Sequence, residues 1–472
     1  MLRPTPFGGF MLQLASMTTG RAMFLLDMTG MALFWPAAVT VWVWSGASSS
    51  AVVQAVLYPV LNLVALYALG LYRRDVVIEV RRSLGRIPVV TVLGVAGAVA
   101  ASALVGVSFA ETGTVPLPAM AVVCFGAAGI SARVAFSAMR RAGLFCRRLL
   151  IVGAGPRAWD LVWMLRHEGL SLNYTIAFVH DPALGEVDSR LADGSAGVIV
   201  PLDSDGFLGI ARRFGADQIV VAPDERRGLP LEGLLDCKIS GYPVQQYLSF
   251  VEKEIRRVDL KRMELSWLLY SDGFHFGTVD RVLKRTLDLL VSFGVLLVLS
   301  PFLLAAMIAI KLEDGGPVLY SQKRVTRHGR VFRIQKLRTM GVNAEAGGAV
   351  WAAQGDARIT RIGAFLRRSR IDELPQLINI LRGEMSFVGP RPERPAFVAQ
   401  LARDIPLYHE RHVAKAGLTG WAQVNYPYGA SINDARSKLS YDLYYVKNFS
   451  VLFDLLIILQ TIRVVLWPGG AR

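Results

Sequence analysis

The chain has 472 residues, of which 53% are hydrophobic and only 19% are charged, and its formal net charge is +15. This length allows about two or three domains, and the apolar excess indicates membrane segments rather than an ordinary soluble protein. The positive charge suits anionic lipid or phosphorylated small molecules. Because zinc-ligand spacing and RNA-binding aromatic patterns are missing from the sequence, we do not expect nucleic acid as a partner. The isolated Cys124, Cys146 and Cys237 predict reduced thiols.

Four apolar runs come first in the chain, at 23–45, 51–72, 87–109 and 115–138. Each is close to the ~20 residues that a helix needs to cross a bilayer. The short links at 46–50 and 110–114 lack Lys and Arg, whereas arginines cluster in the middle link and after the fourth run. The positive-inside rule then predicts that the N-terminus and everything after residue 140 are cytoplasmic. Residues 1–145 are predicted to form a four-helix transmembrane domain; the alternative is a set of buried helices in a large soluble core.

Residues 146–265 predict a small α/β domain with parallel strands. The apolar stretch RRLLIVGAG runs into a glycine turn, and Gly153, Gly155 and Ala158 match the weaker form of the dinucleotide fingerprint. The next strands are expected at YTIAFVHDP and ADQIVVAP. Two interpretations stay open: a Rossmann-like domain that binds a nucleotide cofactor, or a tight strand–helix turn that binds nothing. Asp181 lies further along the chain than the ~20 residues expected of a ribose-binding acid.

A fifth apolar run covers 286–310, and basic residues flank both of its ends. Positive charge on both sides argues against a simple crossing. Ser300 and Pro301 lie near the middle of the run, where proline removes a backbone hydrogen bond and bends a helix. We therefore predict a re-entrant helix, kinked at Ser300 and Pro301, that returns to the face it entered; an ordinary fifth span is the alternative. The stretch 450–467 predicts an interfacial helix or a packed core helix.

A basic stretch and a pair of carboxylates mark the last domain, predicted at 280–472. The alternation in RVFRIQKLRT predicts a strand on which Lys336 and Arg338 project to the same face, an arrangement that suits a diphosphate. A solvated basic surface is the alternative. Asp372 and Glu373 follow an arginine cluster at an expected junction between two helices. A carboxylate among arginines is held ionised and can act as a nucleophile.

Three stretches are the most specific motifs of the sequence: KRVTRHGRVFRIQKLRTM, RIDELPQLINILRGEMSFVGPRPERP and GLTGWAQVNYPYGAS. With these motifs, residues from about 280 to 467 resemble the bacterial sugar transferases, which are polyprenyl-phosphate hexose-1-phosphate transferases. The four N-terminal helices and the CoA-binding-like Rossmann module resemble the large members of this family, which initiate exopolysaccharide or O-antigen assembly. The YPYGAS and SDGF stretches resemble the exopolysaccharide subgroup. The expected fold is thus an α/β membrane protein with a mainly helical, monotopic catalytic domain.

The resemblance implies an enzyme that transfers hexose 1-phosphate, expected to be glucose 1-phosphate, from a UDP-sugar to polyprenyl (undecaprenyl) phosphate with release of UMP. Asp372 would be the nucleophile that carries the phosphosugar and a Mg²⁺ ligand, and Glu373 would assist it. Four cations would contact the phosphates and the nucleotide: Lys336, Arg338, Arg367 and Arg391. The catalytic domain would contact membrane lipid at the cytoplasmic face of the bacterial inner membrane, and a homodimer is an open alternative to a monomer.

Three residues depart from the family pattern. Thr326 stands where the family usually has glycine, Glu384 where it usually has aspartate, and Ala416 where it often has proline. Two other functions stay open. One is a membrane-anchored NAD-dependent nucleotide-sugar dehydratase or epimerase, which usually needs a Tyr-x-x-x-Lys pair that this sequence lacks. The other is a non-catalytic scaffold of polysaccharide assembly.

Overall fold

The computed structural model describes residues 19–44, 51–73, 76–77, 80–104, 117–225, 227–274, 277–341, 358–427, 429 and 431–466. The chain divides into two compact units, the first ending at Ile255 and the second starting at Arg256. The two links used in the topology prediction, 46–50 and 110–114, lie outside the described residues, as do Tyr428 and Ala430 of the YPYGAS stretch.

The first unit begins with the four predicted apolar helices, which are confirmed: α2 (Thr19–Trp44), α3 (Ala51–Ala68), α5 (Val80–Leu104) and α6 (Leu117–Arg141). By length and composition α2, α5 and α6 can each cross a membrane, whereas α3 is a shorter apolar helix. Large apolar side chains such as Leu33 (71% exposed) and Val123 (70% exposed) point outward, as lipid-facing helices require. Asp27 and Arg133 form a fully buried ion pair between α2 and α6, so each neutralises the other.

The predicted parallel α/β sheet is also confirmed. Its strands have the order β3-β2-β1-β4-β5 and all neighbours are parallel. The strands are β1 (Arg147–Val152), β2 (Tyr174–His180), β3 (Val198–Pro201), β4 (Gln218–Val221) and β5 (Val244–Gln246). The helices are α7 (Pro156–His167), α8 (Gly206–Phe214), α9 (Leu231–Ile239) and α10 (Tyr247–Ile255). Residues Leu149–Val152 of β1 are completely buried, which explains why this strand is a continuous apolar run rather than an alternating one.

The second unit combines short helices with two small sheets. An antiparallel hairpin joins β6 (Leu319–Val325) to β7 (Val331–Leu337), and a parallel pair joins β8 (Ser386–Val388) to β9 (Gly417–Thr419). The helices are α11 (Leu265–Tyr270), α12 (Thr278–Asp314), α13 (Arg361–Ser369), α14 (Gln376–Arg382), α15 (Pro395–Asp404), α16 (Trp421–Asn425), α17 (Ile432–Lys447) and α18 (Val451–Leu466). Leu377 and Ile380 of α14 lie fully buried in the main core with Val446 and Ile457, so α14 is anchored at the centre of the unit.

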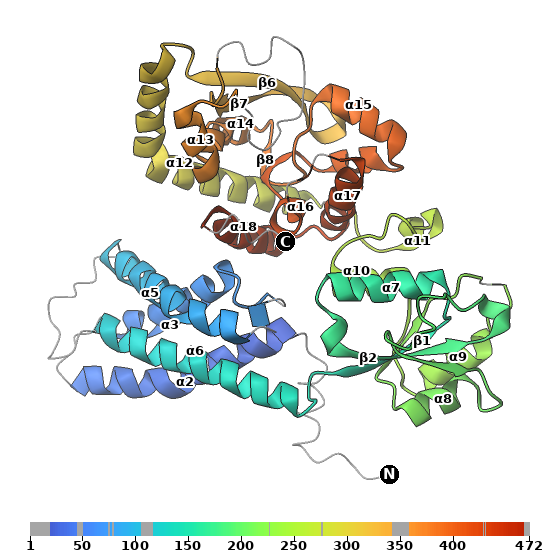
Figure 1. Ribbon diagram of the computed structural model, residues 1–472. Helices are drawn as coiled ribbons and strands as arrows, with labels where there is room; N and C mark the ends of the chain where they lie inside the picture. The colour runs from blue at the N-terminus through green and yellow to red at the C-terminus, as the bar shows by residue number, and fades with distance from the viewer. Residues whose placement is uncertain are drawn as a thin grey trace. The chain divides into compact units, whose positions relative to one another are not determined.

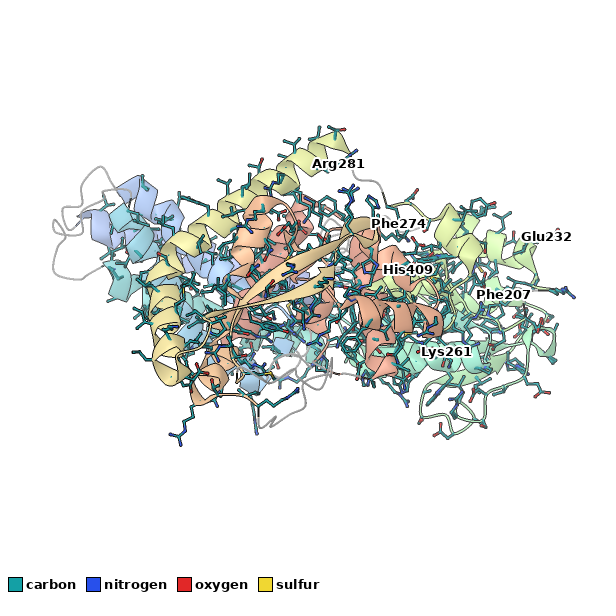
Figure 2. The ribbon with its side chains drawn as sticks, turned by 90° about the horizontal axis from the view of Figure 1, so that it is seen from above. Phe207, Glu232, Lys261, Phe274, Arg281 and His409 are labelled. Atoms are coloured by element: carbon teal, nitrogen blue, oxygen red, sulfur yellow. The ribbon has the colours of Figure 1, made fainter. Side chains whose placement is uncertain are left out.

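The long apolar helix α12 bends inside the unit. Pro301 lies within it, and Figure 1 shows α12 turning sharply between two arms. Figure 2 shows the same bend from above, with Arg281 at the start of the first arm. Proline cannot donate the hydrogen bond of the preceding turn, and the Ser300 hydroxyl donates to the Leu297 carbonyl at 2.8 Å instead. Phe293 is 62% exposed, so the apolar surface of the helix is largely uncovered.

Ion pairs hold both ends of α12 to other elements of the second unit. Near its start, Lys284 pairs with Asp454 of α18 at 2.6 Å. At its end, Asp314 pairs with Arg338. α18 itself is packed on one face, because Asp454 and Arg463 are buried, while Leu452 on the other face is 67% exposed.

Candidate active site

The acid pair lies at a junction between two helices. Helix α13 ends at Ser369, and Arg370 takes a left-handed conformation (φ 59°) that turns the chain. A single 3-10 turn, η4 (Ile371–Glu373), carries Asp372 and Glu373 before α14 begins. The local turn explains how two adjacent carboxylates can take different surroundings.

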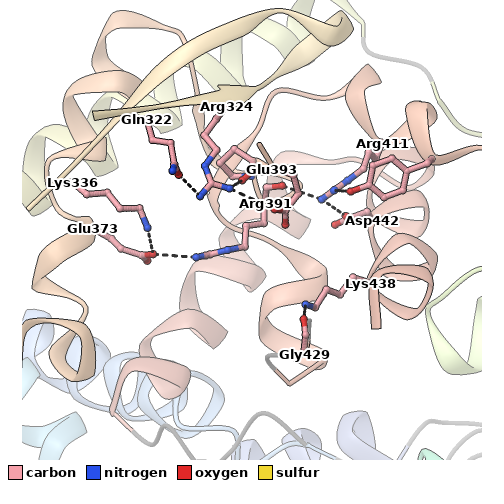
Figure 3. Close-up of polar contacts among 12 residues, drawn as sticks. Gln322, Arg324, Lys336, Glu373, Arg391, Glu393, Arg411, Gly429, Lys438 and Asp442 are labelled. Carbon is pink, nitrogen blue, oxygen red and sulfur yellow. Dashed lines mark hydrogen bonds and ion pairs between the residues drawn. The ribbon is translucent and has the colours of Figure 1, made fainter. Parts of the chain in front are cut away.

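Glu373 is held by three cations. Its Oε1 lies 2.9 Å from Lys336 Nζ and 3.3 Å from Arg391 Nη2, and its Oε2 lies 3.6 Å from Arg370 Nη1. Figure 3 shows Lys336 and Arg391 approaching this carboxylate from two directions. Burial acts to raise the pKa of Glu373, but the positive charges outweigh it and leave the pKa well below its usual range. Glu373 is therefore ionised and fixed in place.

Asp372 differs from its neighbour. Its side chain is 8% exposed, and within the described part of the chain its buried Oδ1 has no hydrogen-bond partner. Burial, helped by the negative charge of Glu373, raises the pKa of Asp372 to about 6 against the opposing charges of Lys336, Arg370 and Arg367. From the sequence we expected the arginines to hold the carboxylates ionised. The cations hold Glu373 in its ionised form more strongly than Asp372. Environments that push two carboxyl pKa values apart are typical of acid pairs with separate roles.

The remaining predicted cations divide between the acid pair and other partners. Arg391 reaches Glu373, as described above. Arg367 donates from Nε to Thr339 Oγ1 at 2.8 Å, and its charge acts on Asp372. Arg338 follows the end of β7, is buried, and binds Asp314 and the Pro317 carbonyl. Among the described residues no contact links Arg338 to the acid pair, because its guanidinium is bound to Asp314 at the end of α12.

A buried ion pair supports the Pro-Arg-Pro turn, and the sequence interpretation did not include it. Arg411 donates from Nη2 to the Arg391 carbonyl at 3.0 Å and from Nη1 to the Tyr408 hydroxyl at 2.7 Å. Arg411 Nη2 also lies 2.7 Å from Asp442 Oδ2, and both side chains are almost fully buried. Figure 3 shows Arg391 extending from this pair toward Glu373. Arg411 is thus a positioning residue for Arg391.

The three residues that depart from the family pattern touch one another. Thr326 Oγ1 accepts the Ala416 N–H at 3.1 Å and donates to the Glu384 carbonyl at 3.1 Å. A proline at position 416 would have no N–H to donate, and a glycine at 326 would have no hydroxyl to receive it. The departures at 326 and 416 are therefore matched, whereas Glu384 contributes to this contact only its backbone carbonyl, which an aspartate would also supply.

In the first unit, the glycine turn after β1 is filled by the protein's own carboxylate. Asp224 Oδ1 accepts the Arg157 N–H at 3.1 Å in the first turn of α7. A Cβ placed on Gly155 would lie 2.1 Å from Asp224 Oδ2. A helix N-terminus attracts anions, and here Asp224 is the anion next to it. The cofactor interpretation of this domain stays a prediction.

Comparison with known proteins places the chain in a family. Residues 279–468 match the family described as bacterial sugar transferase. Over 265 residues, 56% of this chain, it is 43% identical to UDP-N-acetylgalactosamine-undecaprenyl-phosphate N-acetylgalactosaminephosphotransferase of Aeromonas hydrophila, of which it spans 61%, less than two thirds.

Two further relatives are covered more completely. The chain is 43% identical over 190 residues, 39% of its length, to exopolysaccharide production protein PSS of Rhizobium leguminosarum bv. phaseoli, and spans 95% of that protein. It is 30% identical over 330 residues, 68% of each chain, to UDP-glucose:undecaprenyl-phosphate glucose-1-phosphate transferase of Klebsiella pneumoniae. The matching residues contain the Asp-Glu junction, the basic hairpin and the Pro-Arg-Pro turn. This chain therefore belongs to the bacterial sugar transferase family.

Proposed function

We propose that this protein transfers hexose 1-phosphate from a UDP-sugar to undecaprenyl phosphate and releases UMP, as the first membrane step of exopolysaccharide or O-antigen assembly. The observation that carries the proposal is the contrast within the acid pair. Glu373 is held by three cations, whereas Asp372 keeps a carboxylate oxygen without a partner in the described part of the chain. An oxygen that is not tied to a cation is available for a covalent step.

In the first step an Asp372 carboxylate oxygen attacks the β-phosphorus of the UDP-sugar. The bond from that phosphorus to the bridging oxygen breaks, and UMP leaves with the electron pair. In the second step an oxygen of polyprenyl phosphate attacks the same phosphorus, and the Asp372 carboxylate is released as the polyprenyl-diphosphate sugar forms. A covalent route suits one soluble and one lipid substrate, because they need not occupy the site together.

The cations around Glu373 fit the charge demands of phosphoryl transfer. Lys336 and Arg391 both contact Glu373 Oε1, so this carboxylate fixes the two cations at the acid pair. Phosphoryl transfer depends mainly on position and on neutralising charge, which such fixed cations provide. Arg367 acts on Asp372 through its charge. Arg338, bound to Asp314, stays a predicted phosphate ligand.

We also propose Mg²⁺ as the cofactor, held by Asp372 and by the diphosphate of the substrate. Among the described residues there is no group of three side chains of the metal-binding types. Mg²⁺ sites commonly use one or two carboxylates together with substrate phosphates. With the unpartnered Oδ1 kept for the attack, the other carboxylate oxygen of Asp372 would hold the ion. When bound, the ion supplies charge neutralisation at the diphosphate.

For the sugar we propose glucose, supported by the name of the Klebsiella relative. The name of the Aeromonas relative makes N-acetylgalactosamine the rival. For the membrane arrangement we propose that α12 is re-entrant and that the catalytic unit faces the cytoplasm, with lipid around α12. The bend at Pro301 and the attachment of both ends of α12 to one unit support this arrangement.

UMP release from UDP-glucose, UDP-galactose and UDP-N-acetylgalactosamine in membranes with added undecaprenyl phosphate tests the proposal. The wild type should release UMP and form a lipid-linked sugar, and Asp372→Asn should lose at least a thousandfold in rate. Asp404→Asn, an exposed acid at the end of α15, is the matched control and should keep full activity. Unchanged turnover in Asp372→Asn would remove the residue from the chemistry. Absence of UMP release in the wild type would favour a scaffold, and reduction of NAD⁺ would favour the dehydratase alternative.

A further inference from the structure

Three cations gather at the end of α14 that lies away from the acid pair. They are Arg285 of α12, Arg327 after β6, and Lys415 before β9. Gly383, which closes α14 with a left-handed conformation (φ 82°), lies between two of them. A Cβ placed on Gly383 would be 3.7 Å from Arg285 Nη2 and 3.8 Å from Lys415 Nζ. The two charged groups therefore border the same small space, which a side chain at 383 would fill.

The positive charge of this cluster is only partly balanced by the protein, because among the described residues Asp288 is the one acid whose charge acts on Lys415, against three cations. Within the described part of the chain, the ammonium of Lys415 has no hydrogen-bond or ion-pair partner, and the buried Nε of Arg327 has no hydrogen-bond partner. Burial, together with the charges of Arg285, Arg327 and Lys284, lowers the pKa of Lys415. Asp288 opposes this effect, but its Oδ1 already accepts hydrogen bonds from Ser386 and Phe387 at 2.9 Å each.

Arg285 also binds the carbonyl groups at the end of α14, which makes the space near Gly383 suitable for an anion. Its Nη1 donates to the Ile380 carbonyl and its Nη2 to the Leu381 carbonyl, both at 2.7 Å. These carbonyls form the negative end of the α14 dipole, which by itself would repel an anion. With the carbonyls bound to a guanidinium, the field near Gly383 is set by cations.

The cluster lies where α12 begins its apolar stretch. Arg285 comes just before that stretch, and Leu290 and Phe293 on the following turns are 68% and 62% exposed. α12 is long and apolar enough to enter a membrane. Cations at the end of such a helix lie at the depth of the lipid headgroups.

We propose that Lys415, Arg327 and Arg285 bind the phosphate of an anionic membrane phospholipid. The lipid would link the start of α12 to the loop before β9 and the loop after β6. The acceptor lipid is a less suitable ligand, because Asp372 precedes α14 and Gly383 follows it. The seven residues of α14 separate the two places by about 10 Å of helix, which is too far for a phosphate at Gly383 to attack phosphorus on Asp372.

Thermal unfolding of the full-length protein in detergent, titrated with dioctanoyl phosphatidylglycerol, tests this site. The wild type should be stabilised saturably by phosphatidylglycerol and not by dioctanoyl phosphatidylcholine. Lys415→Gln and Arg327→Gln should each raise the half-saturating concentration about tenfold, whereas Lys415→Arg should keep most of the response. Lys323→Gln, an exposed lysine on β6, is the matched control and should behave like the wild type.

Three results would overturn the assignment. One is an equal response of Lys415→Gln and the wild type to phosphatidylglycerol. The second is equal stabilisation by the two phospholipids. The third is stabilisation by a short polyprenyl phosphate that is lost in Lys415→Gln, because that would make the cluster part of the acceptor site. If Lys415→Gln does not fold, the comparison of Arg327→Gln with Lys323→Gln decides the question. The test is independent of the proposed transferase activity, since its readout is lipid binding.

Discussion

The contact between Thr326 and Ala416 gives a sharp test of how this chain departs from its family. Replacing Thr326 with Val keeps the shape of the side chain but removes the oxygen that accepts the Ala416 N–H and donates to the Glu384 carbonyl. Thr326 is 7% and Ala416 4% exposed, so water cannot easily replace the lost partner. A buried donor left without a partner costs about 1–3 kcal/mol, and the second hydrogen bond adds about 1 kcal/mol.

Thr326→Val should therefore destabilise the catalytic unit by about 2–4 kcal/mol. For a unit of ~200 residues this corresponds to a fall in Tm of about 4–16 °C. Thermal unfolding of the detergent-solubilised protein measures it. Ala416→Pro should be costly in the wild type but cheaper in the Thr326→Val background, because the N–H that proline removes no longer has an acceptor.

The double-mutant cycle isolates this contact from other effects of each change. We expect a coupling energy of about 1–2 kcal/mol between positions 326 and 416. Thr326→Ser, which keeps the hydroxyl, is the control and should retain most of the stability. Strictly additive effects of Thr326→Val and Ala416→Pro would refute the reasoning.

Three further predictions concern the site. Arg411→Met should lower the free energy of unfolding by about 3–5 kcal/mol, because it leaves the buried Asp442 unpaired. It should also raise KM for the UDP-sugar about tenfold, because the Arg391 carbonyl is no longer held. Adding Asp442→Leu should restore Tm but not KM, and recovery of both would contradict the positioning role. Because burial raises the pKa of Asp372 to about 6 and the attack needs its ionised form, kcat/KM should fall as pH drops through about 6; a profile flat to pH 5 would argue against Asp372 as the nucleophile. Chelation by EDTA should abolish UMP release and added Mg²⁺ should restore it, whereas full activity in EDTA would rule out the proposed ion.

Local sequence patterns predicted the elements that depend on local physics. Hydropathy runs of helix length located α2, α3, α5 and α6, and the apolar stretch RRLLIVGAG located β1. The change from one helix to another around Asp372 was likewise expected, because the apolar spacing breaks there. These predictions need only the periodicity of nearby residues.

Partners that are distant in sequence could not be predicted in this way. Arg338 was expected beside Lys336, but its partner Asp314 lies at the end of α12, and only the packing of α12 against β7 brings the two together. Arg411 and Asp442 meet for the same reason. One weak signal was present for Asp442, a carboxylate among the leucines and tyrosines of the second half of α17. A buried charge on a helix face indicates an ion-pair partner but does not identify it.

The most direct test of the central claim is intact-protein mass spectrometry of the enzyme mixed with UDP-glucose and Mg²⁺ in the absence of polyprenyl phosphate. The account predicts a mass increase of one hexose phosphate, located by peptide mapping on Asp372, which disappears with formation of the lipid-linked sugar when polyprenyl phosphate is added. The adduct should be absent from Asp372→Asn and present in Asp404→Asn. UMP release that strictly requires both substrates together, with no adduct at any time, would contradict it.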